Sequence, residues 1–384
     1  MCANKIGKKT ICTEKIYIKS ISIMDMLIKY FSLLLLFNGF TNAQNPCKTP
    51  EQKEGICIPL HQCPPLLTIV KNFKKTSTES QIKFALQSQC VAPDNSKSVC
   101  CAEPSFKESD FPMPGECGSQ LQERIVGGEE SSIFEYPWFA LIEYTKTGES
   151  PRFICGGTLI HKDYVITAAH CINEPKLVQS GWKIKSVRLG EHDLRTDIDC
   201  DDDEVCAPPV VNVDILETFV HEAYDPNSPT QYNDIALMRL SHSVEFTDFV
   251  RPICLPFSPT VRVENFDGIH LSVCGFGGTE NGTSSDVKLK VEINGFNWDR
   301  CNNLYGRQLV TTQICAGGEH GKDSCSGDSG GPLMRDSKLM STLPITYLVG
   351  IVSRGPQACG KKDYPAIYTR VDKFLSWIRY QIKL

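Results

Sequence analysis

The chain has 384 residues, enough for about two domains, and its 41% hydrophobic and 22% charged residues are ordinary for a globular protein. This composition argues against a fibrous or disordered protein. The formal net charge of −5, with no basic stripe along the sequence, argues against a nucleic-acid partner.

The 19 cysteines are the most informative count. Such density is expected only where disulfides persist, outside the reducing cytosol, so a secretory signal should be present. The apolar run Phe31–Phe37 is too short to span a bilayer, follows Lys29 and precedes small residues ending at Ala43. We therefore predict a signal peptide over residues 1–43 and no membrane partner. The run starts late for a signal peptide, which suggests an upstream extension of the sequence.

The next predicted unit, residues 44–101, holds six cysteines and several prolines. So small a unit cannot bury much core and must be held by disulfides. Six cysteines allow fifteen pairings, and spacing alone does not choose among them. Adjacent Cys100 and Cys101 must find different partners, because neighbouring side chains on a strand point to opposite faces.

This cysteine spacing resembles the clip domain of arthropod zymogens. A small inhibitor-like or structural knot without a binding role is the alternative. The resemblance implies the bridges Cys47–Cys100, Cys57–Cys90 and Cys63–Cys101.

A polar, proline-rich linker is predicted over residues 102–124. Beyond it, residues 125–384 contain many short apolar runs separated by Gly, Pro, Asn and Asp, a rhythm that predicts an antiparallel β sandwich or barrel. Examples are Trp138–Tyr144, Ile235–Leu240, Val287–Ile293 and Ile345–Val352. After Asp372, which can cap a helix, apolar residues at helical spacing predict a closing helix.

Three segments carry candidate chemistry: TAAHC around His170, NDIAL around Asp234 and GDSGGP around Ser329. A serine hydroxyl attacks an amide at neutral pH only when an adjacent base takes its proton. Ser329 is the expected nucleophile, His170 the base that later protonates the leaving amine, and Asp234 the group that orients the imidazole. Gly327 is expected to bring its N–H, with that of Ser329, to the developing oxyanion.

The order of these three motifs and their flanks resembles the chymotrypsin family of serine proteases. The resemblance covers residues 125–384 and implies an all-β, chymotrypsin-like double antiparallel β-barrel with a C-terminal helix, preceded by the disulfide-knotted clip domain. It also implies a zymogen cut after Arg124. The new amino terminus at Ile125 would then pair with Asp328 and shape the oxyanion hole, since a buried amine needs a partner.

The position six residues before the serine, here Asp323, lies at the base of the primary pocket in trypsin-like members of the family. The resemblance therefore implies a pocket for a basic residue, because a buried carboxylate needs a cation. Ser353 and Gly355 would line its entrance. Arg354 stands where the family usually has tryptophan, and Ala366 where it usually has glycine. The added methyl would narrow the pocket, and the guanidinium would repel basic residues further along the substrate. Cleavage after Arg or Lys remains the expectation, with the preference between the two left open.

The resemblance also implies the disulfides of the second domain. The pair Cys117–Cys254 would keep the clip module attached after activation. Cys274 is left over, and a buried, inert thiol is favoured over an intermolecular bridge. Asn281 begins an Asn-Gly-Thr acceptor and is the expected glycosylation site. The other implied pairs are Cys155–Cys171, Cys200–Cys206, Cys301–Cys315 and Cys325–Cys359.

An acidic stretch between Glu191 and Pro208 offers oxygens to a hard cation. Resemblance to the calcium loop of trypsin-like proteases implies carboxylate ligands from Glu191 and Asp199, and backbone carbonyl ligands from Asp193 and Thr196. A solvated acidic surface loop is the alternative. No cofactor is expected for catalysis.

Together these modules imply a secreted serine endopeptidase in an extracellular, haemolymph cascade of innate immunity or development, such as Toll activation or melanisation. The expected partners are an upstream trypsin-like activator, a downstream zymogen or cytokine precursor, and serpin inhibitors. A catalytically inert clip-domain adaptor is the alternative, but the full set of active-site residues favours an enzyme. A digestive protease is disfavoured, since gut enzymes rarely need a stapled recognition module.

Overall fold

The computed structural model describes residues 46–60, 63–71, 78–91, 97–102, 111–120, 129–263, 265–278, 284–319, 327–338, 344–356 and 362–382. The described residues beyond Pro46 belong to one compact unit, Cys47–Leu384. The predicted signal peptide lies outside the described residues. Within the described part of the chain, no helix combines the length and apolar character needed to cross a membrane.

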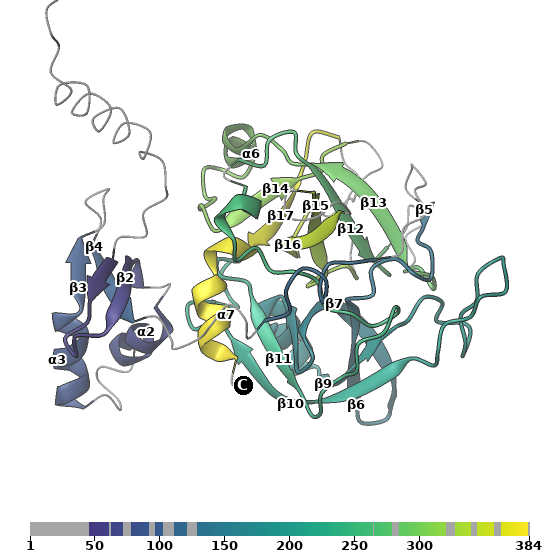
Figure 1. The fold of residues 1–384 in the computed structure, drawn as a ribbon, viewed down its shortest axis with the longest axis horizontal. Helices are drawn as coiled ribbons and strands as arrows, with labels where there is room; N and C mark the ends of the chain where they lie inside the picture. The colour runs from purple at the N-terminus through teal and green to yellow at the C-terminus, as the bar shows by residue number, and fades with distance from the viewer. Residues whose placement is uncertain are drawn as a thin grey trace, which may run out of the picture. The chain divides into compact units, whose positions relative to one another are not determined.

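The amino-terminal module, residues 47–101, is a four-stranded sheet with two short helices (Figure 1). Helix α3 begins with a reciprocal cap, in which the Thr78 side chain accepts from the Gln81 N–H and the Gln81 side chain accepts from the Thr78 N–H. In spatial order the strands are β1 (Pro46–Lys48), β2 (Glu54–Ile58), β4 (Lys97–Ala102) and β3 (Gln89–Val91), and the helices are α2 (Pro64–Lys71) and α3 (Glu79–Gln87).

Three disulfides hold this module together, and they are the three pairings that the sequence implied: Cys47–Cys100, Cys57–Cys90 and Cys63–Cys101. Cys100 and Cys101, adjacent on β4, have different partners, as their opposite orientations on a strand require. The apolar core beside them is small, with Leu66, Ala85 and Val99 as its buried non-cysteine members. Covalent links therefore replace much of the core that a larger domain would bury.

The first β unit of the larger domain is a closed six-stranded barrel (Figure 1). Strand β9 pairs with both β6 and β10, which closes the ring and leaves no exposed sheet edge. Its interior is apolar, with Leu159, Ile166 and Val213 fully buried. The strands are β6 (Phe139–Lys146), β7 (Glu149–His161), β8 (Tyr164–Thr167), β9 (Lys183–Leu189), β10 (Val211–Val220) and β11 (Ala236–Leu240).

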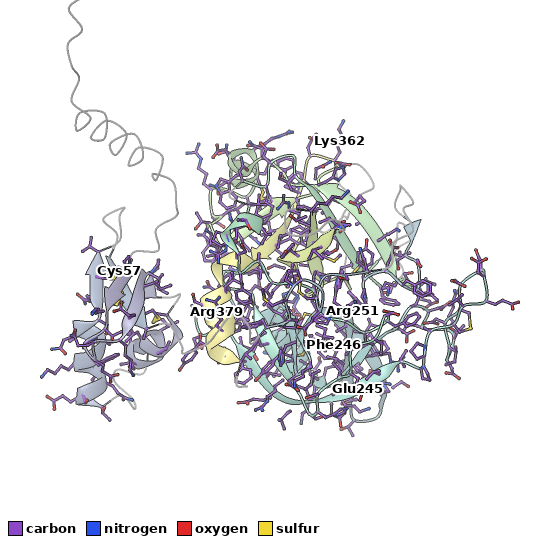
Figure 2. All side chains as sticks on the ribbon, viewed as in Figure 1. Cys57, Glu245, Phe246, Arg251, Lys362 and Arg379 are labelled. Carbon is purple, nitrogen blue, oxygen red and sulfur yellow. A yellow bond between two sulfur atoms is a disulfide. The ribbon has the colours of Figure 1, made fainter. Side chains whose placement is uncertain are left out.

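The second β unit is a seven-stranded antiparallel sheet around a separate apolar cluster that includes Leu271, Ile293 and Tyr368. Figure 2 draws the side chains of both units, and their buried apolar members form two clusters. The predicted all-β fold with two β units is thus confirmed. In spatial order the strands are β14 (Gln313–Ala316), β17 (Ala366–Arg370), β16 (Ile345–Arg354), β15 (Pro332–Ser337), β12 (His270–Gly275), β13 (Leu289–Asn294) and β5 (Glu129–Glu130).

A closing helix is present, but its predicted cap is wrong. Helix α7 spans Leu375–Gln381 and follows a 3-10 turn, η4 (Val371–Lys373), that contains Asp372. The Asp372 carboxylate accepts from the Arg370 guanidinium at 2.6 Å, and the N-cap position is Phe374, which makes no side-chain cap. Other short helices are α4 (Ala169–Asn173), α5 (Pro175–Gln179), α6 (Trp298–Leu304) and η3 (Pro259–Val261).

Three contacts fix α7 on the domain. Glu222 accepts hydrogen bonds from the Trp377 indole at 3.0 Å and from the Gln381 amide at 2.8 Å. Arg379, labelled in Figure 2, places its guanidinium carbon 4.5 Å from the centre of the Phe257 ring. The helix is therefore held by polar contacts as well as by its buried apolar face.

A buried ion pair joins the start of the larger domain to β13. The Lys290 ammonium donates to both Glu135 carboxylate oxygens, at 2.7 and 2.9 Å, and the two side chains are only 8% and 4% exposed. The Glu135 carboxylate also accepts from the Ser132 N–H. Removing one partner of such a pair leaves an uncompensated buried charge.

Replacing Glu135 by glutamine is therefore expected to lower the free energy of unfolding by about 3–5 kcal/mol. The matched control is Asp363→Asn, which also exchanges an acid for its amide but in the exposed Arg300–Asp363 pair. That change should shift stability by less than about 1 kcal/mol. Denaturant unfolding of the intact, disulfide-bonded protein measures both, and equal small effects would contradict the assignment.

Candidate active site

His170 and Asp234 form a hydrogen-bonded pair. The His170 Nδ1 lies 2.8 Å from Asp234 Oδ2, and the His170 backbone N–H donates to Asp234 Oδ1 at 2.9 Å. His170 lies in α4 directly after β8, and Asp234 directly precedes β11. Because β8 and β11 are paired neighbours in the first barrel, residues 64 positions apart in the chain meet at one end of it.

Two strands of the second β unit hold the aspartate in place. The Ser353 hydroxyl, on β16, donates to Asp234 Oδ2 at 2.6 Å, and the Thr369 hydroxyl, on β17, donates to the Asp234 carbonyl at 2.7 Å. Asp234 is completely buried. The pair therefore lies where the two β units meet. Ser353, expected at the pocket entrance, thus also holds the aspartate, and Thr369 is a further contact for which the sequence carries no separate signal.

The environment of His170 raises its pKa above the ordinary value. Burial alone would lower the pKa, but the charge of Asp234 and its hydrogen bond to Nδ1 outweigh burial. With the carboxylate on Nδ1, that nitrogen carries the proton, and Nε2 is left as the acceptor. This is the tautomer that a general base needs.

The segment that carries Ser329 packs against the first barrel. The Ser329 carbonyl accepts from the Gly156 N–H of β7 at 2.8 Å. A methyl group added at Gly330 would collide with Thr167 and with the Gly156 carbonyl, so only glycine allows this approach, and its φ of +80° is also one that glycine favours. Gly330 lies close to Thr167, the last residue of β8, and this places Ser329 beside the turn that leads to His170.

Gly327 and Asp328 occupy a niche beside the nucleophile. Gly327 has φ +105°, a conformation that side chains other than glycine rarely adopt. The buried Asp328 carboxylate accepts from the Gly277 N–H at 2.9 Å, and a methyl group at Gly275 or Gly277 would overlap that carboxylate. Ile125, the predicted partner of Asp328 after activation, and Arg124, the predicted cleavage site, lie outside the described residues.

The predicted pocket is described only in part. Ser353 is the second-to-last residue of β16, and Gly355 directly follows that strand. A Cβ built on Gly355 would lie 3.6 Å from the Ala366 Cβ, so these two positions face each other. Asp323 and the pair Cys325–Cys359 lie outside the described residues, as does Asn281.

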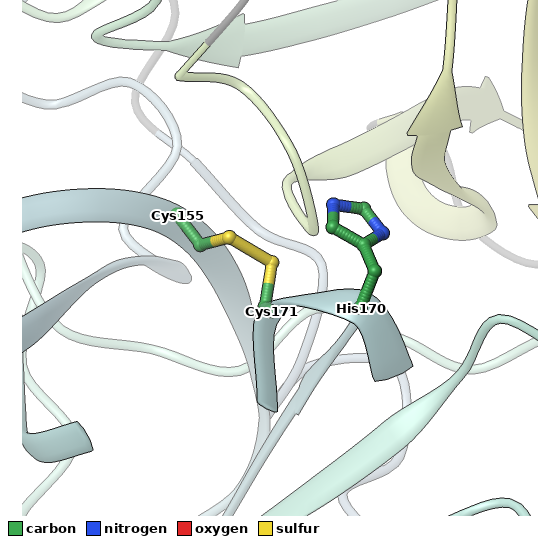
Figure 3. Close-up of side chains that lie close together, drawn as sticks. All are labelled: Cys155, His170 and Cys171. Atoms are coloured by element: carbon green, nitrogen blue, oxygen red, sulfur yellow. A yellow bond between two sulfur atoms is a disulfide. The ribbon is translucent and has the colours of Figure 1, made fainter. Parts of the chain in front are cut away.

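A disulfide lies beside the catalytic imidazole. Cys155 on β7 bonds to Cys171 on α4, next to His170 (Figure 3). Ligand atoms of these three residues lie within 4.8 Å of one another, the one such His, Cys, Asp or Glu group found in the described part of the chain. Because both sulfurs are bonded to each other, neither is a thiolate that could bind a metal. The bond instead anchors the histidine turn to β7.

The other implied cysteine pairs within the described ranges are also present: Cys117–Cys254, Cys200–Cys206 and Cys301–Cys315. Cys274 is unpaired and buried. Burial raises its pKa well above the ordinary value, so it stays a neutral thiol. The prediction that Cys274 is a buried, unpaired thiol is confirmed, and its inertness stays a prediction.

The acidic loop brings two carboxylates into the protein interior. Glu191 and Asp199 are only 5% and 6% exposed, and the pKa of Glu191 is raised, chiefly by burial and further by the charge of Asp199. Asp199 accepts from the His192 N–H at 2.9 Å, and Glu191 accepts from Arg188 at 3.0 Å. The Asp193 carbonyl accepts from the Thr196 N–H. Two neighbouring buried carboxylates are oxygen donors of the kind that a hard cation binds. The Arg188 guanidinium and the buried Lys288 ammonium, whose Nζ donates to the Glu191 carbonyl at 3.4 Å, lie beside them.

Comparisons with known proteins agree with this geometry. The family model "Trypsin" matches residues 125–378, and the model "Regulatory CLIP domain of proteinases" matches residues 47–101. "Serine protease ea" of Drosophila melanogaster is 41% identical over 361 residues, covering 88% of this chain and 91% of that protein. The "Spaetzle-processing enzyme" of the same species is 37% identical over 366 residues, covering 87% and 91%.

Among solved structures, the "Crystal structure of drosophila Grass clip serine protease of Toll pathway" matches with a TM-score of 0.63 and 34% identity, covering 88% of this chain and 96% of that one. The two family models together cover a clip module and a trypsin-like domain of this chain, and the solved structure is named a clip serine protease. The chain therefore belongs to the clip-domain serine proteases, and it is a serine endopeptidase.

Proposed function

We propose that the protein is a secreted zymogen that is activated by cleavage after Arg124 and then cuts protein substrates after arginine or lysine in an extracellular cascade. The observation that carries this proposal is the complete His170–Asp234 pair beside the Ser329 segment. An inert adaptor, the alternative, has no need of a buried aspartate held by three side-chain and backbone donors.

The proposed reaction follows from the roles of these groups. The Ser329 hydroxyl attacks the scissile carbonyl while His170 Nε2 takes its proton, and the imidazolium then gives that proton to the leaving amine. Asp234 stabilises the imidazolium through the Nδ1 hydrogen bond. The N–H groups of Gly327 and Ser329 stabilise the oxyanion. Water then releases the acyl group by the same steps.

The activation switch is proposed to act through Asp328. Cleavage after Arg124 creates an α-amine at Ile125, and the Asp328 niche offers a buried carboxylate to receive it. Pairing would fix the adjacent Gly327 and thus the oxyanion hole, since a buried amine is stable only when paired.

Arg124→Gln is expected to keep the protein inactive after incubation with a trypsin-like activator, whereas the wild type gains at least about 100-fold in activity, as expected when an oxyanion-hole donor is ordered. A reducing gel should separate the cleaved wild type into two chains. A non-reducing gel should keep them joined, because Cys117–Cys254 spans the cut. Full activation of the Arg124→Gln variant, or separation without reductant, would contradict the proposal.

Specificity for basic residues is supported by Asp323 in the sequence and by the facing positions of Gly355 and Ala366. The cascade role is supported by the relatives, one named as a Spaetzle-processing enzyme and one described as belonging to the Toll pathway. We therefore propose a zymogen or cytokine precursor as the substrate, a trypsin-like protease as the activator and serpins as inhibitors. Incubating the cleaved enzyme with such precursors and mapping the new termini identifies the substrate.

We also propose that calcium binds the acidic loop through Glu191 and Asp199 and through the carbonyls of Asp193 and Thr196. Bound calcium would neutralise the two buried carboxylates. Calcium is expected to raise the melting temperature of the wild type by several degrees, about what 1–2 kcal/mol of binding linkage gives. Glu191→Gln should remove that increase, while Asp214→Asn, an acid on β10 outside the loop, should keep it. An unchanged wild-type melting temperature would favour a merely solvated loop.

A further inference from the structure

Arg354 is a cation next to the reactive groups that the mechanism above does not use. It ends β16 and follows Ser353, whose hydroxyl binds Asp234. Its guanidinium Nη1 donates to the Pro229 carbonyl at 2.9 Å, and its central carbon lies 5.2 Å from the centre of the Tyr305 ring. Pro229 belongs to the loop that leads to Asp234, so the side chain bridges that loop and the segment after α6.

The guanidinium is only partly satisfied. Its Nε and Nη2 atoms are buried and have no hydrogen-bond partner among the described residues. Burial lowers the pKa of Arg354, and the only charged-group effects that accompany it come from Tyr305 and Tyr232. Among the described residues, no carboxylate therefore balances this half-buried charge.

The two free donors have a geometry that selects their acceptor. Nε and Nη2 form one edge of the planar guanidinium, and two parallel N–H bonds from that edge match the two oxygens of a carboxylate. A buried donor without an acceptor is unfavourable, and a buried cation even more so, unless an anion pairs with it. The ligand that relieves both penalties is an aspartate or glutamate side chain.

The neighbours of Arg354 indicate which part of a substrate it faces. Ser353 and Gly355, on either side of it, are the residues expected at the entrance of the pocket for the residue before the cleaved bond. A substrate side chain that meets Arg354 must then belong to one of the preceding residues. One hydrogen bond, to Pro229, and the ring of Tyr305 hold the partly exposed side chain, so turning it toward a substrate breaks a single hydrogen bond.

We propose that Arg354 is a specificity-determining residue that binds the carboxylate of an aspartate or glutamate located two to four residues before the cleaved bond. The inference rests on the proposed cleavage of protein substrates after Arg or Lys. It adds a second requirement, for an acidic residue shortly before the basic one. The substrate would present an acidic residue followed closely by the basic residue at the cut, a combination that excludes uniformly basic sites.

Cleavage of a random-sequence peptide library by the activated enzyme tests this directly, with products identified by mass spectrometry. We expect Asp and Glu to be favoured over Lys and Arg by about tenfold or more at one of the three positions, as one charged hydrogen-bonded contact gives. Arg354→Gln should abolish that preference, and Arg354→Glu should invert it toward basic residues. The matched control Arg300→Gln, an arginine 5.2 Å from the Phe296 ring and paired with Asp363, should keep it.

The same cleavage products report the preference for a basic residue at the cut and the preference for an acidic residue before it separately. The residue directly before the cut tests the proposed basic pocket, and the three residues before that test Arg354. A wild-type enzyme without acidic preference, or an Arg354→Gln variant that retains it, would overturn the inference even if every cut follows Arg or Lys. An activated enzyme that cuts no peptide would overturn the proposed activity and this inference together.

Discussion

Ser329→Ala is expected to abolish peptide hydrolysis by the activated protein, lowering kcat by about 10⁶-fold, because no other group can form the acyl intermediate. The fold should be unaffected. The contacts of this segment use backbone atoms, such as the Ser329 carbonyl with the Gly156 N–H, and those atoms survive the change.

Steady-state kinetics of the cleaved protein measure this loss. Circular dichroism and cleavage after Arg124 by an external protease serve as controls that the variant is folded and processed. A Ser329→Ala protein that hydrolyses peptides at a rate near that of the wild type would show that another residue is the nucleophile.

Asp234→Asn is expected to lower kcat by about 10⁴-fold with little change in structure. The carboxylate accepts from the His170 ring, the His170 backbone and the Ser353 hydroxyl. An amide turned so that its nitrogen faces Nδ1 can only donate there, so the imidazole would hold its proton on Nε2 and could not accept the serine proton. The matched control is Asp163→Asn, in a second His–Asp pair formed with His161, which should leave kcat unchanged.

The pH dependence of the same two proteins gives an independent readout. Only neutral His170 can act as a base, so kcat/KM is expected to fall as the pH drops through the histidine pKa. In the wild type that pKa is raised, and the midpoint should lie above the ordinary value of 6.5. Asp234→Asn removes the charge that raises the pKa but leaves the burial that lowers it, so the midpoint should move to lower pH. A wild-type midpoint below 6.5 would contradict this electrostatic account.

The sequence was sufficient to identify those functional residues that lie in short local motifs. His170, Asp234 and Ser329 each lie in a short motif, and few functions other than nucleophilic catalysis would require all three motifs together. The observed His170–Asp234 pair agrees with their proposed roles. The cysteine pairs also followed from the resemblance. In contrast, Thr78 and Gln81 have the spacing of a capping box, a local signal for the start of α3 that was not among the predictions.

Contacts between distant strands could not be predicted in this way. Thr369 reaches Asp234 because β16 and β17 pair in a particular register, and nothing near Thr369 signals that register. Glu135 and Lys290 resemble ordinary surface charges, although they form a buried pair 155 residues apart. Asp372 was expected to cap α7, but the local Arg370 guanidinium competes successfully for its carboxylate.

The role of Arg354 could be predicted from the sequence only in part. Its departure from the family pattern was visible in the sequence and suggested repulsion of basic substrate residues. Its two unsatisfied donors were not visible, because they depend on where Pro229 and Tyr305 hold the guanidinium. Repulsion of a base and attraction of an acid are two consequences of the same charge, and the structure adds the geometry that makes the attraction specific.

The most direct test of the central claim is the intact mass of the activated protein after treatment with a serine-directed fluorophosphonate, followed by peptide mapping. A hydroxyl activated by His170 should take up one phosphonyl group per molecule, on Ser329, and the precursor not yet cleaved after Arg124 should react far more slowly. Labelling at any other residue, or none in the cleaved protein, would contradict the account of a serine made nucleophilic by the histidine–aspartate pair.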